Sequence, residues 1–254
     1  MVKKVLSPRK TVAKLKAYDP GKHAVDINLS ANENPYDLPE ALRAQVVKAS
    51  ADLAFNRYPD PDARDLRAVI AKRYGLEPDN VVMGNGGDEL LLSLLLAFGG
   101  ESRSAVTFEP TFSMYKILCD VTSTPCVTLR RRDDFALPEA VADKVNQAKG
   151  DIVFVCSPNN PSGNLATEDE IVSLLEETDS LVVVDEAYEE FSRASIYKLL
   201  DTYPNLAILR TFSKAFSLAG LRVGYLLGSP EVILNIKKVK LPYNLNAFSQ
   251  AAAK

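Results

Sequence analysis

Short apolar runs alternate with amphipathic segments of helical length from about residue 80 onward. The runs are nearly all apolar, which is typical of parallel strands that helices cover on both faces. The amphipathic segments include residues 138–147 and 168–177, and the second is preceded by Thr167 and contains Glu170 at the spacing of a capping box. The pattern predicts an α/β fold with a mainly parallel sheet flanked by helices. The predicted strands are residues 81–83, 105–108, 152–156, 181–185, 207–211 and 223–227.

The first 40 or so residues lack a strong hydrophobic period. They are rich in Pro and Asn and include the segments YDPG (18–21) and NENP (32–35), so we expect an extended N-terminal arm that leads into a helix near residues 39–53. We assign residues 1–45 to the arm and the start of a small domain, and residues 46–254 to a large domain. The chain stops within a segment that has the pattern of a helix.

The composition is that of an ordinary globular protein, with 46% hydrophobic residues, 25% charged residues and a net charge of −3 over 254 residues. Nucleic-acid-binding proteins usually carry a clustered basic excess. The one basic run, residues 130–132, is followed at once by Asp133 and Asp134, and we interpret it as a solvated turn. The longest apolar stretch, residues 90–98, is far shorter than the roughly 20 residues that span a bilayer. These features argue against a nucleic-acid or membrane partner.

The cysteine and histidine residues argue against several classes of catalytic and metal-binding site. The three cysteines, Cys119, Cys126 and Cys156, show no CxxC spacing, which predicts free thiols in a reducing cytoplasm. The single histidine, His23, argues against both a Ser-His-Asp triad and a His-rich metal site. We therefore expect no metal centre.

Polar clusters follow several predicted strands, at the edge where parallel α/β sheets bind ligands. After residues 81–83 comes a glycine-rich turn, residues 84–89, and then a helix start whose free N–H groups suit a phosphate. The dinucleotide fingerprint fails because Glu89 stands in place of its third glycine, and a Walker-type Gly-Lys-Ser/Thr is absent. Taken alone, this turn is as compatible with a structural role as with phosphate binding.

The next clusters are individually ambiguous as well. The run SPNNPSG (157–163) has strong turn chemistry, and a surface loop is its simpler interpretation. Asp185 ends a buried apolar strand, where a carboxylate is costly to desolvate unless it has a cationic or hydrogen-bonding partner. That partner could be a structural arginine. Tyr188, three residues later, would point into the same crevice.

Lys214 lies between Phe212 and Phe216 in a predicted strand-to-helix turn. Partial desolvation lowers the pKa of a lysine and favours the neutral amine that a Schiff base requires. The alternative is a surface lysine whose aliphatic stem covers the two rings, and for a single lysine this alternative is the more common case. The clusters together change that balance. A phosphate cradle, a strand-end Asp, an Asn, a Tyr and a buried Lys are the parts of a pyridoxal-phosphate site.

The sequence resembles the fold-type I aminotransferases and, among them, the histidinol-phosphate aminotransferases. The resemblance covers essentially the whole chain, and its motifs are RTFSKAFSLAGLRVGY, CSPNNPSG, VVVDEAY, NRYPDP and SANENPY. It implies a large cofactor domain whose partner, a C-terminal small domain with the arginine that grips the substrate, is largely missing from this chain. We therefore expect the full-length parent to be active and this chain alone to be weak or inactive.

The resemblance implies a role for each matching residue. Lys214 would hold pyridoxal phosphate as a Schiff base and, once displaced by substrate, move the proton between Cα and C4′. Asp185 would pair with the pyridinium nitrogen, Asn160 and Tyr188 would hydrogen-bond the phenolic oxygen, and Phe112 would stack on the ring. The groups that would hold the phosphate are the backbone amides of Gly87 and Asp88, the hydroxyls of Thr211 and Ser213, and Arg222.

Tyr58 matches a tyrosine that reaches the phosphate from a second subunit, which implies a homodimer with shared active sites. Tyr18, Asn34 and Asn160 are the expected substrate-binding residues. The implied reaction converts L-histidinol phosphate and 2-oxoglutarate into imidazole-acetol phosphate and L-glutamate, in cytoplasmic histidine biosynthesis.

Three other functions stay open. An aromatic or broad-specificity aminotransferase, or a threonine-phosphate decarboxylase, would share Lys214, Asp185 and Arg222. A non-catalytic binding protein on the same fold would need a basic DNA-binding module, which is not present in this sequence. A nicotinamide-dependent oxidoreductase is disfavoured by the broken glycine fingerprint.

Overall fold

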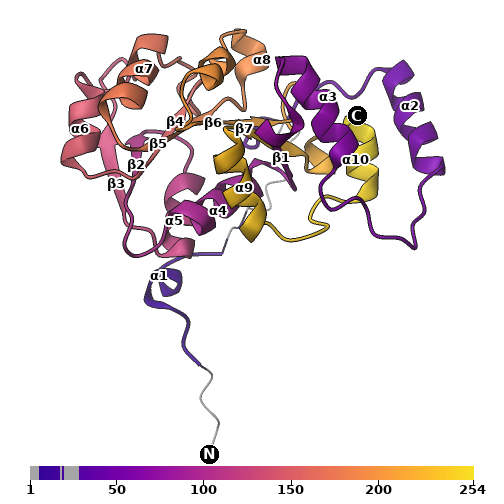
Figure 1. The fold of residues 1–254 in the computed structure, drawn as a ribbon, viewed down its shortest axis with the longest axis horizontal. Coiled ribbons are helices and arrows are strands. Elements are labelled where there is room, and N and C mark those ends of the chain that lie inside the picture. Colours follow the sequence, from indigo (N-terminus) through magenta and orange to yellow (C-terminus); the bar gives the residue numbers. More distant parts are fainter. Residues whose placement is uncertain (1–5, 18, 20–28) are drawn as a thin grey trace, which may run out of the picture.

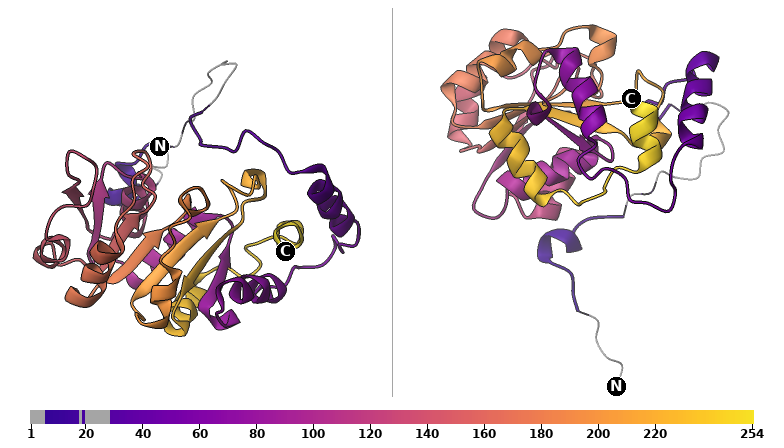
Figure 2. Two further views of the ribbon diagram at one scale, coloured as in Figure 1. Left: turned by 90° about the horizontal axis from the view of Figure 1, so that it is seen from above. Right: turned by 45° about the vertical axis from the view of Figure 1, so that its right-hand side comes forward.

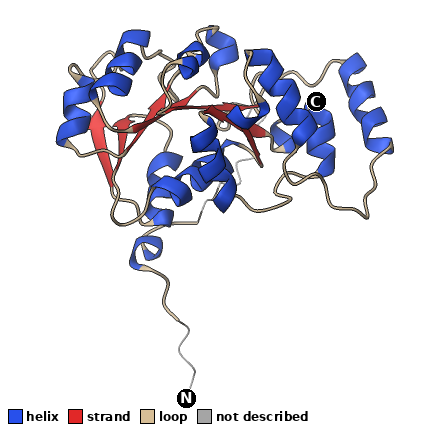
Figure 3. Cartoon of the chain, in the orientation of Figure 1, coloured by secondary structure: helices blue, strands red, loops and turns tan. Residues whose placement is uncertain are grey.

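The computed structural model describes residues 6–17, 19 and 29–254. A sheet in the order β1-β7-β6-β5-β4-β2-β3 lies between helices on its two faces (Figures 1 and 3). Its strands are β1 (Val81–Gly84), β2 (Ala105–Glu109), β3 (Cys126–Arg130), β4 (Ile152–Cys156), β5 (Leu181–Asp185), β6 (Leu206–Thr211) and β7 (Gly224–Gly228).

The sheet is mainly parallel, as predicted. The pairs β2–β3, β2–β4, β4–β5 and β5–β6 are parallel, and β7 runs antiparallel to both β6 and β1. Each predicted strand is present with its ends within one residue of the predicted ones. Strand β3 was not among the predicted strands. This strand lies at the sheet edge and is only half-buried, so Cys126–Arg130 lacks the continuous apolar run that marked the others.

Side-chain alternation along each strand builds a hydrophobic core on either face. In β4, Val153 and Val155 pack into one core, while Ile152, Phe154 and Cys156 pack into the other. The first core lies beneath α3 (Arg64–Tyr74), α6 (Val141–Gln147) and α7 (Glu168–Glu177). The second lies against α4 (Gly87–Phe98), α5 (Met114–Thr122) and α9 (Pro230–Val239) (Figure 1). This arrangement explains why β4 is apolar at every position.

The helix ends follow local backbone chemistry. The predicted capping box of α7 is confirmed: the Glu170 backbone N–H donates to Thr167 Oγ1 at 3.2 Å, and Glu170 Oε2 accepts from the Thr167 backbone N–H at 2.7 Å. Helix α6 begins at Val141 rather than at residue 138. Ala140 precedes it with φ 50°, a left-handed conformation that a right-handed helix cannot include.

Helix α2 (Glu40–Ala51) and the last helix, α10 (Ala247–Ala253), lie beyond the β1 side of the sheet (Figures 1 and 2). Helix α2 matches the predicted first helix, and it contacts α10. The predicted boundary at residue 45 falls inside α2, and the division into two domains stays a prediction. Short elements complete the described part: α1 (Lys10–Ala13), α8 (Glu189–Ser192), η1 (Pro78–Asn80), η2 (Tyr197–Asp201) and η3 (Ala219–Leu221).

The interpretation of residues 130–132 as a solvated turn is wrong at Arg131. Arg130 ends β3, whereas Arg131 is only 3% exposed. The Arg131 guanidinium donates to the carbonyl oxygens of Phe108 at 3.0 Å, Phe135 at 2.9 Å and Cys156 at 3.4 Å. It therefore ties the carboxyl ends of β2 and β4 together, and burial lowers its pKa. In the described part of the chain, every helix is too short or too polar to cross a membrane.

Candidate active site

The carboxyl ends of β4, β5 and β6 meet near the start of α4 and carry most of the predicted site residues. Asp185 is the last residue of β5, and Thr211 is the last residue of β6. Asn160 follows β4, which pairs with β5 so that Cys156 lies opposite Asp185. The strand order alone thus brings residues from distant parts of the sequence to one edge of the sheet.

The Asp185 carboxylate is buried, at 4% exposure, and both of its oxygens are held. The Tyr115 hydroxyl donates to Oδ2 at 2.7 Å, and the Ala187 backbone N–H donates to Oδ1 at 3.0 Å. Burial raises the pKa of Asp185 to about 6, and the bond from Tyr115 opposes that rise. A buried carboxylate held by these two donors is well suited to accept a further proton-bearing group from a ligand.

The structural arginine near Asp185 is Arg210, and it pairs with the next residue, Glu186. Arg210 forms an ion pair with Glu186 at 2.8 Å, and it also bonds Glu189 and Glu190. Glu186 follows β5, and its carboxylate contacts Arg210, the Ser195 hydroxyl and the Ile196 backbone N–H rather than the partners of Asp185. The alternative interpretation of Asp185 therefore fails among the described residues, because a tyrosine hydroxyl and a backbone amide donate to its carboxylate.

Three aromatic rings support this corner of the site. Tyr115 stacks on Phe154 at a centroid distance of 5.1 Å and meets Phe112 edge-on at 5.6 Å. Tyr115 was not among the predicted site residues. A signal was available, since Tyr115 follows Phe112 by three residues, a spacing that puts both side chains on one side of a helical turn.

Lys214 lies half-buried in the turn after β6. Its Nζ donates to the Ala31 carbonyl at 2.7 Å and lies 5.7 Å from the centre of the Tyr188 ring. Burial lowers the pKa of Lys214, in the direction expected for a lysine flanked by Phe212 and Phe216. The expected α-helix after this turn is wrong: the chain makes only the 3-10 turn η3 before entering β7.

A segment of the N-terminal arm lies across this turn. The Asn32 side-chain amide donates to the Tyr188 hydroxyl at 3.1 Å, and the Asn34 side-chain amide donates to the Ala215 carbonyl at 3.3 Å. Asn34 was predicted as a substrate residue, whereas Asn32 was missed. Tyr18 lies outside the described residues.

The turn before α4 has the shape of an anion cradle. Gly86 is the N-cap residue with φ 88°, a conformation that glycine adopts most readily. A Cβ on Gly224 of β7 would lie 2.8 Å from Gly86 C and from Gly87 N, so only glycine allows the strand to approach this closely. The N–H groups of Gly87 and Asp88 belong to the first turn of a helix, where intrahelical acceptors are lacking.

The remaining predicted phosphate groups lie around that turn. Arg222 Nη2 lies 3.5 Å from Asp88 Oδ2, and Arg222 Nη1 donates to Ser213 Oγ at 3.4 Å. The Ser213 backbone N–H donates to Thr211 Oγ1 at 3.0 Å. The structure therefore brings together Gly87, Asp88, Thr211, Ser213 and Arg222.

Tyr58 stands apart from this cluster. It is 81% exposed and stacks on Tyr243 with ring centres 4.5 Å apart. Among the described residues, groups of three or more side chains that could hold a metal ion are not found.

Comparison with known proteins assigns the chain to a family. A family model described as aminotransferase class I and II matches residues 24–254. The chain belongs to this family. Histidinol-phosphate aminotransferase 1 of Carboxydothermus hydrogenoformans is 46% identical over 245 residues, which cover 96% of this chain and 70% of that protein. Histidinol-phosphate aminotransferase of Thermococcus gammatolerans is 44% identical, over 89% of this chain and 65% of that protein.

Solved structures of family members have the same fold. The histidinol-phosphate aminotransferase of Sinorhizobium meliloti, in complex with pyridoxal-5'-phosphate, has a TM-score of 0.79 at 26% identity, over 88% of this chain and 62% of that one. L-threonine-O-3-phosphate decarboxylase of Porphyromonas gingivalis has a TM-score of 0.73 at 26% identity, over 84% of this chain and 63% of that one. The chain thus spans about two thirds of the length of these relatives, and the resemblance inferred from the motifs is confirmed.

Proposed function

We propose that this chain is the cofactor-binding part of a pyridoxal-phosphate-dependent aminotransferase that transfers the amino group of L-histidinol phosphate to 2-oxoglutarate in histidine biosynthesis. The observation that carries the proposal is the placement of a half-buried lysine, Lys214, beside Tyr188 and near the buried carboxylate of Asp185. The identity to histidinol-phosphate aminotransferases over nearly the whole chain supports the amino donor.

The described residues fit pyridoxal phosphate by charge and by shape. Asp185 offers a buried carboxylate for the ring nitrogen. Glycine at positions 86 and 224 lets Arg222 and the β7 backbone pack closely against the turn before α4, whose first N–H groups would bind the phosphate. Phe112 is the candidate for stacking on the ring, and Asn160 and Tyr188 are the candidates for its phenolic oxygen.

Each protein group has a defined task in this proposal. The bound cofactor supplies a conjugated ring that withdraws electrons from the substrate Cα. Asp185 keeps the ring nitrogen protonated, and Tyr115 and the Ala187 N–H hold that carboxylate in place. The lowered pKa of Lys214 favours a neutral amine, which can take the proton from Cα of the amino donor.

The cofactor part of the proposal is tested by an absorption spectrum of the purified protein with pyridoxal phosphate, before and after borohydride. We expect a visible band in the wild type that is lost when borohydride reduces the Schiff base, which leaves the cofactor covalently attached to the wild type but not to Lys214→Ala. A wild-type protein that shows no band after addition of the cofactor would contradict the assignment.

The substrate is tested by comparing donors in a coupled assay on the full-length parent. Histidinol phosphate should be turned over faster than phenylalanine, and threonine phosphate should release no carbon dioxide. Decarboxylation of threonine phosphate would instead support the activity of the Porphyromonas gingivalis relative, whose fold this chain shares.

We also propose a homodimer in the cytoplasm. Tyr58 is exposed and stacks on Tyr243 rather than on a predicted cofactor residue of its own chain, which supports a contact with the site of a second subunit. The free thiols of all three cysteines support a reducing compartment. Mixing inactive Lys214→Ala and Tyr58→Ala variants of the parent protein should restore part of the activity, because a mixed dimer contains one intact site. Failure of mixed dimers to regain activity would argue against a shared site.

A further inference from the structure

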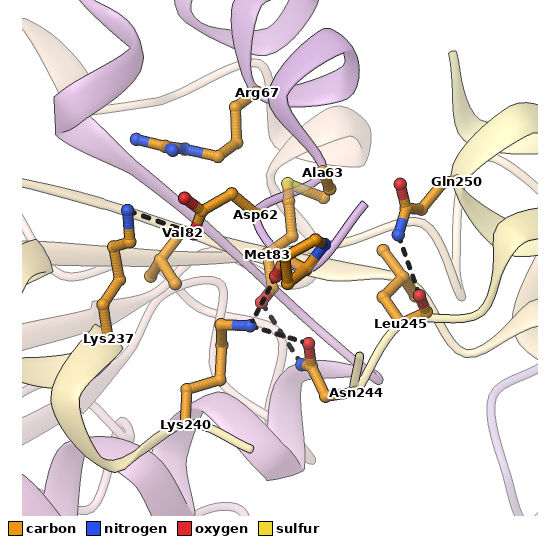
Figure 4. Close-up of a pocket in the computed structure, with 11 residues that line it drawn as sticks. Asp62, Ala63, Arg67, Val82, Met83, Lys237, Lys240, Asn244, Leu245 and Gln250 are labelled. Carbon is orange, nitrogen blue, oxygen red and sulfur yellow. Dashed lines mark hydrogen bonds and ion pairs between the residues drawn. The ribbon is translucent and has the colours of Figure 1, made fainter. Parts of the chain in front are cut away.

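A chain of polar contacts runs from the end of α9 to the turn before α4. Lys240 Nζ donates to Asn244 Oδ1 at 2.8 Å, and Asn244 Nδ2 donates to Glu89 Oε2 at 2.7 Å. The same Glu89 oxygen accepts a hydrogen bond from the backbone N–H of Asn85. Figure 4 shows Lys240 and Asn244 facing one another beside Met83, the residue of β1 that leads into this turn.

The space around these side chains is too small for a ligand. The cavity that Lys240 and Asn244 line has a volume of about 10 Å³, which is about the minimum for one water molecule. The Lys240 ammonium also donates to the carbonyls of Pro61 at 3.1 Å and Leu241 at 3.4 Å. Its three N–H donors are therefore all matched to acceptors. We call the contacts among Lys240, Asn244, Glu89 and Asn85 the joint. The joint connects segments that are distant in sequence.

The joint links the positive charge of Lys240 to the negative charge of Glu89. Without that cation, Glu89 would repel a phosphate bound at the turn. Asp88 and Glu89 both lie in the first turn of α4, where the cofactor phosphate would bring further negative charge. Arg222 lies 3.5 Å from Asp88. Glu89 faces Lys240 through Asn244, and Glu89 counteracts the lowering of the Lys240 pKa by burial. Asp88 is thus paired with Arg222, and Glu89 is linked to Lys240 through Asn244.

The joint also fixes the backbone of the turn. Glu89 holds the N–H of Asn85, the residue before Gly86. The direction of the Gly87 and Asp88 N–H groups depends on the backbone angles at Asn85 and Gly86. A turn held at both ends presents these donors without a further ordering cost when an anion binds.

We propose that Lys240, Asn244 and Glu89 are positioning residues for the phosphate group of the cofactor, acting through the backbone of residues 85–88. This inference rests on the proposed function, because it takes the start of α4 as the phosphate site. The three residues themselves would not touch the cofactor. Glu89 and Asn244 would hold the turn, and Lys240 would offset the negative charge of Glu89.

The test compares pyridoxal phosphate with pyridoxal, which lacks the phosphate. Dissociation constants are measured by absorbance titration for wild type, Asn244→Leu and Lys240→Met. We expect both variants to bind pyridoxal phosphate about tenfold more weakly, since each loses a hydrogen bond that involves a charged group. Binding of pyridoxal should change less than about twofold, because the affected turn contacts only the phosphate.

Lys237→Met is the matched control. Lys237 lies on α9 and lines the same cavity (Figure 4), but it pairs with Asp62 at 3.1 Å rather than with the Asn244–Glu89 pair. We expect this control to bind both compounds as the wild type does. Lys240→Arg, which keeps the charge and the donors, should recover most of the affinity for pyridoxal phosphate.

Two outcomes would overturn the proposal. An equal loss of affinity for both compounds would show general damage to the site, and unchanged affinity for pyridoxal phosphate would show that the joint does not act on the phosphate. If Asn244→Leu does not fold, the isosteric Asn244→Asp replaces it, with its folding checked by urea unfolding. A wild-type protein that binds neither compound would contradict the proposed function, whereas wild-type binding with unaffected variants contradicts this inference alone.

Discussion

The Tyr115 hydroxyl donates a 2.7 Å hydrogen bond to Oδ2 of Asp185. Both side chains are buried, and burial raises the pKa of each. The bond favours the charged form of the carboxylate, because the hydroxyl is its only side-chain donor among the described residues. Tyr115 thus counteracts the cost that burial imposes on Asp185.

Removing this hydroxyl should raise the pKa of Asp185 above about 6. Tyr115→Phe keeps the ring that stacks on Phe154 and loses only the donor. We expect a further rise of about one pH unit, which corresponds to about 1.4 kcal/mol for one hydrogen bond to a charged group. The measurement is a carboxyl ¹³C titration of aspartate-labelled, cofactor-free protein, with Asp185→Asn to assign the signal. A signal that titrates at the same pH in both proteins would rule out this coupling.

The raised pKa of Asp185 also makes stability depend on pH. The carboxyl has a pKa of about 6 in the folded protein and 3.8 as its ordinary value, so between these limits the folded state binds more protons than the unfolded state. Its contribution to stability is fully present below about pH 4 and is lost as the pH rises through 6. The loss is about 3 kcal/mol for a difference of about two pH units.

The comparison that isolates this effect is wild type against Asp185→Asn. The difference between their free energies of unfolding in urea should change in favour of Asp185→Asn as the pH rises from 4 to 7. Other carboxyl groups titrate over this range, but they do so in both proteins. A constant difference across the range would mean that Asp185 has an ordinary pKa.

Gly224 should be essential for the shape of the phosphate turn. A Cβ on Gly224 would lie 2.8 Å from backbone atoms of Gly86 and Gly87, which cannot move as a flexible side chain could. We expect Gly224→Ala to weaken binding of pyridoxal phosphate by more than about tenfold, at a cost of about 1–3 kcal/mol in folding stability. Gly228→Ala in the same strand is the control, since its nearest atoms lie 3.5 Å away. Titration of the cofactor against both variants checks this, and equal affinities would contradict it.

Arg131 should contribute strongly to the stability of the sheet edge. Its guanidinium is buried and bonded to the carbonyls of Phe108, Phe135 and Cys156. Arg131→Met would leave these acceptors without that donor, and we expect a loss of about 3 kcal/mol in the free energy of unfolding. Arg132→Met, at a half-exposed neighbour that pairs with Asp134, should change it by less than about 0.5 kcal/mol. Urea unfolding of the two variants provides the comparison.

The sequence predicts the fold well where the hydrophobic pattern is continuous. The central strands β4 and β5 are buried at nearly every position, so their apolar runs mark them unambiguously. The edge strand β3 escaped notice because solvent on one side permits polar residues within it. Arg131 was misread for a related reason, since a buried arginine bonded only to backbone carbonyls has no recognisable partner in the sequence.

Some residues of the candidate site could be predicted from the sequence, and others could not. Residues that end strands, such as Asp185 and Thr211, could be placed from the sequence because the topology of a parallel sheet brings strand ends together. Asn244 and Lys240 could not be placed, since their contacts depend on how α9 and the loop after it pack against the sheet. Their roles follow from distances and not from motifs.

The bond from Lys214 to the Ala31 carbonyl has a thermodynamic consequence. A ligand that bonds to Lys214 Nζ would compete with the Ala31 carbonyl for this nitrogen, so ligand binding and this contact would oppose each other. Such coupling is reciprocal. A change that strengthens the contact between Lys214 and Ala31 would therefore weaken the ligand to the same extent that the ligand weakens this contact.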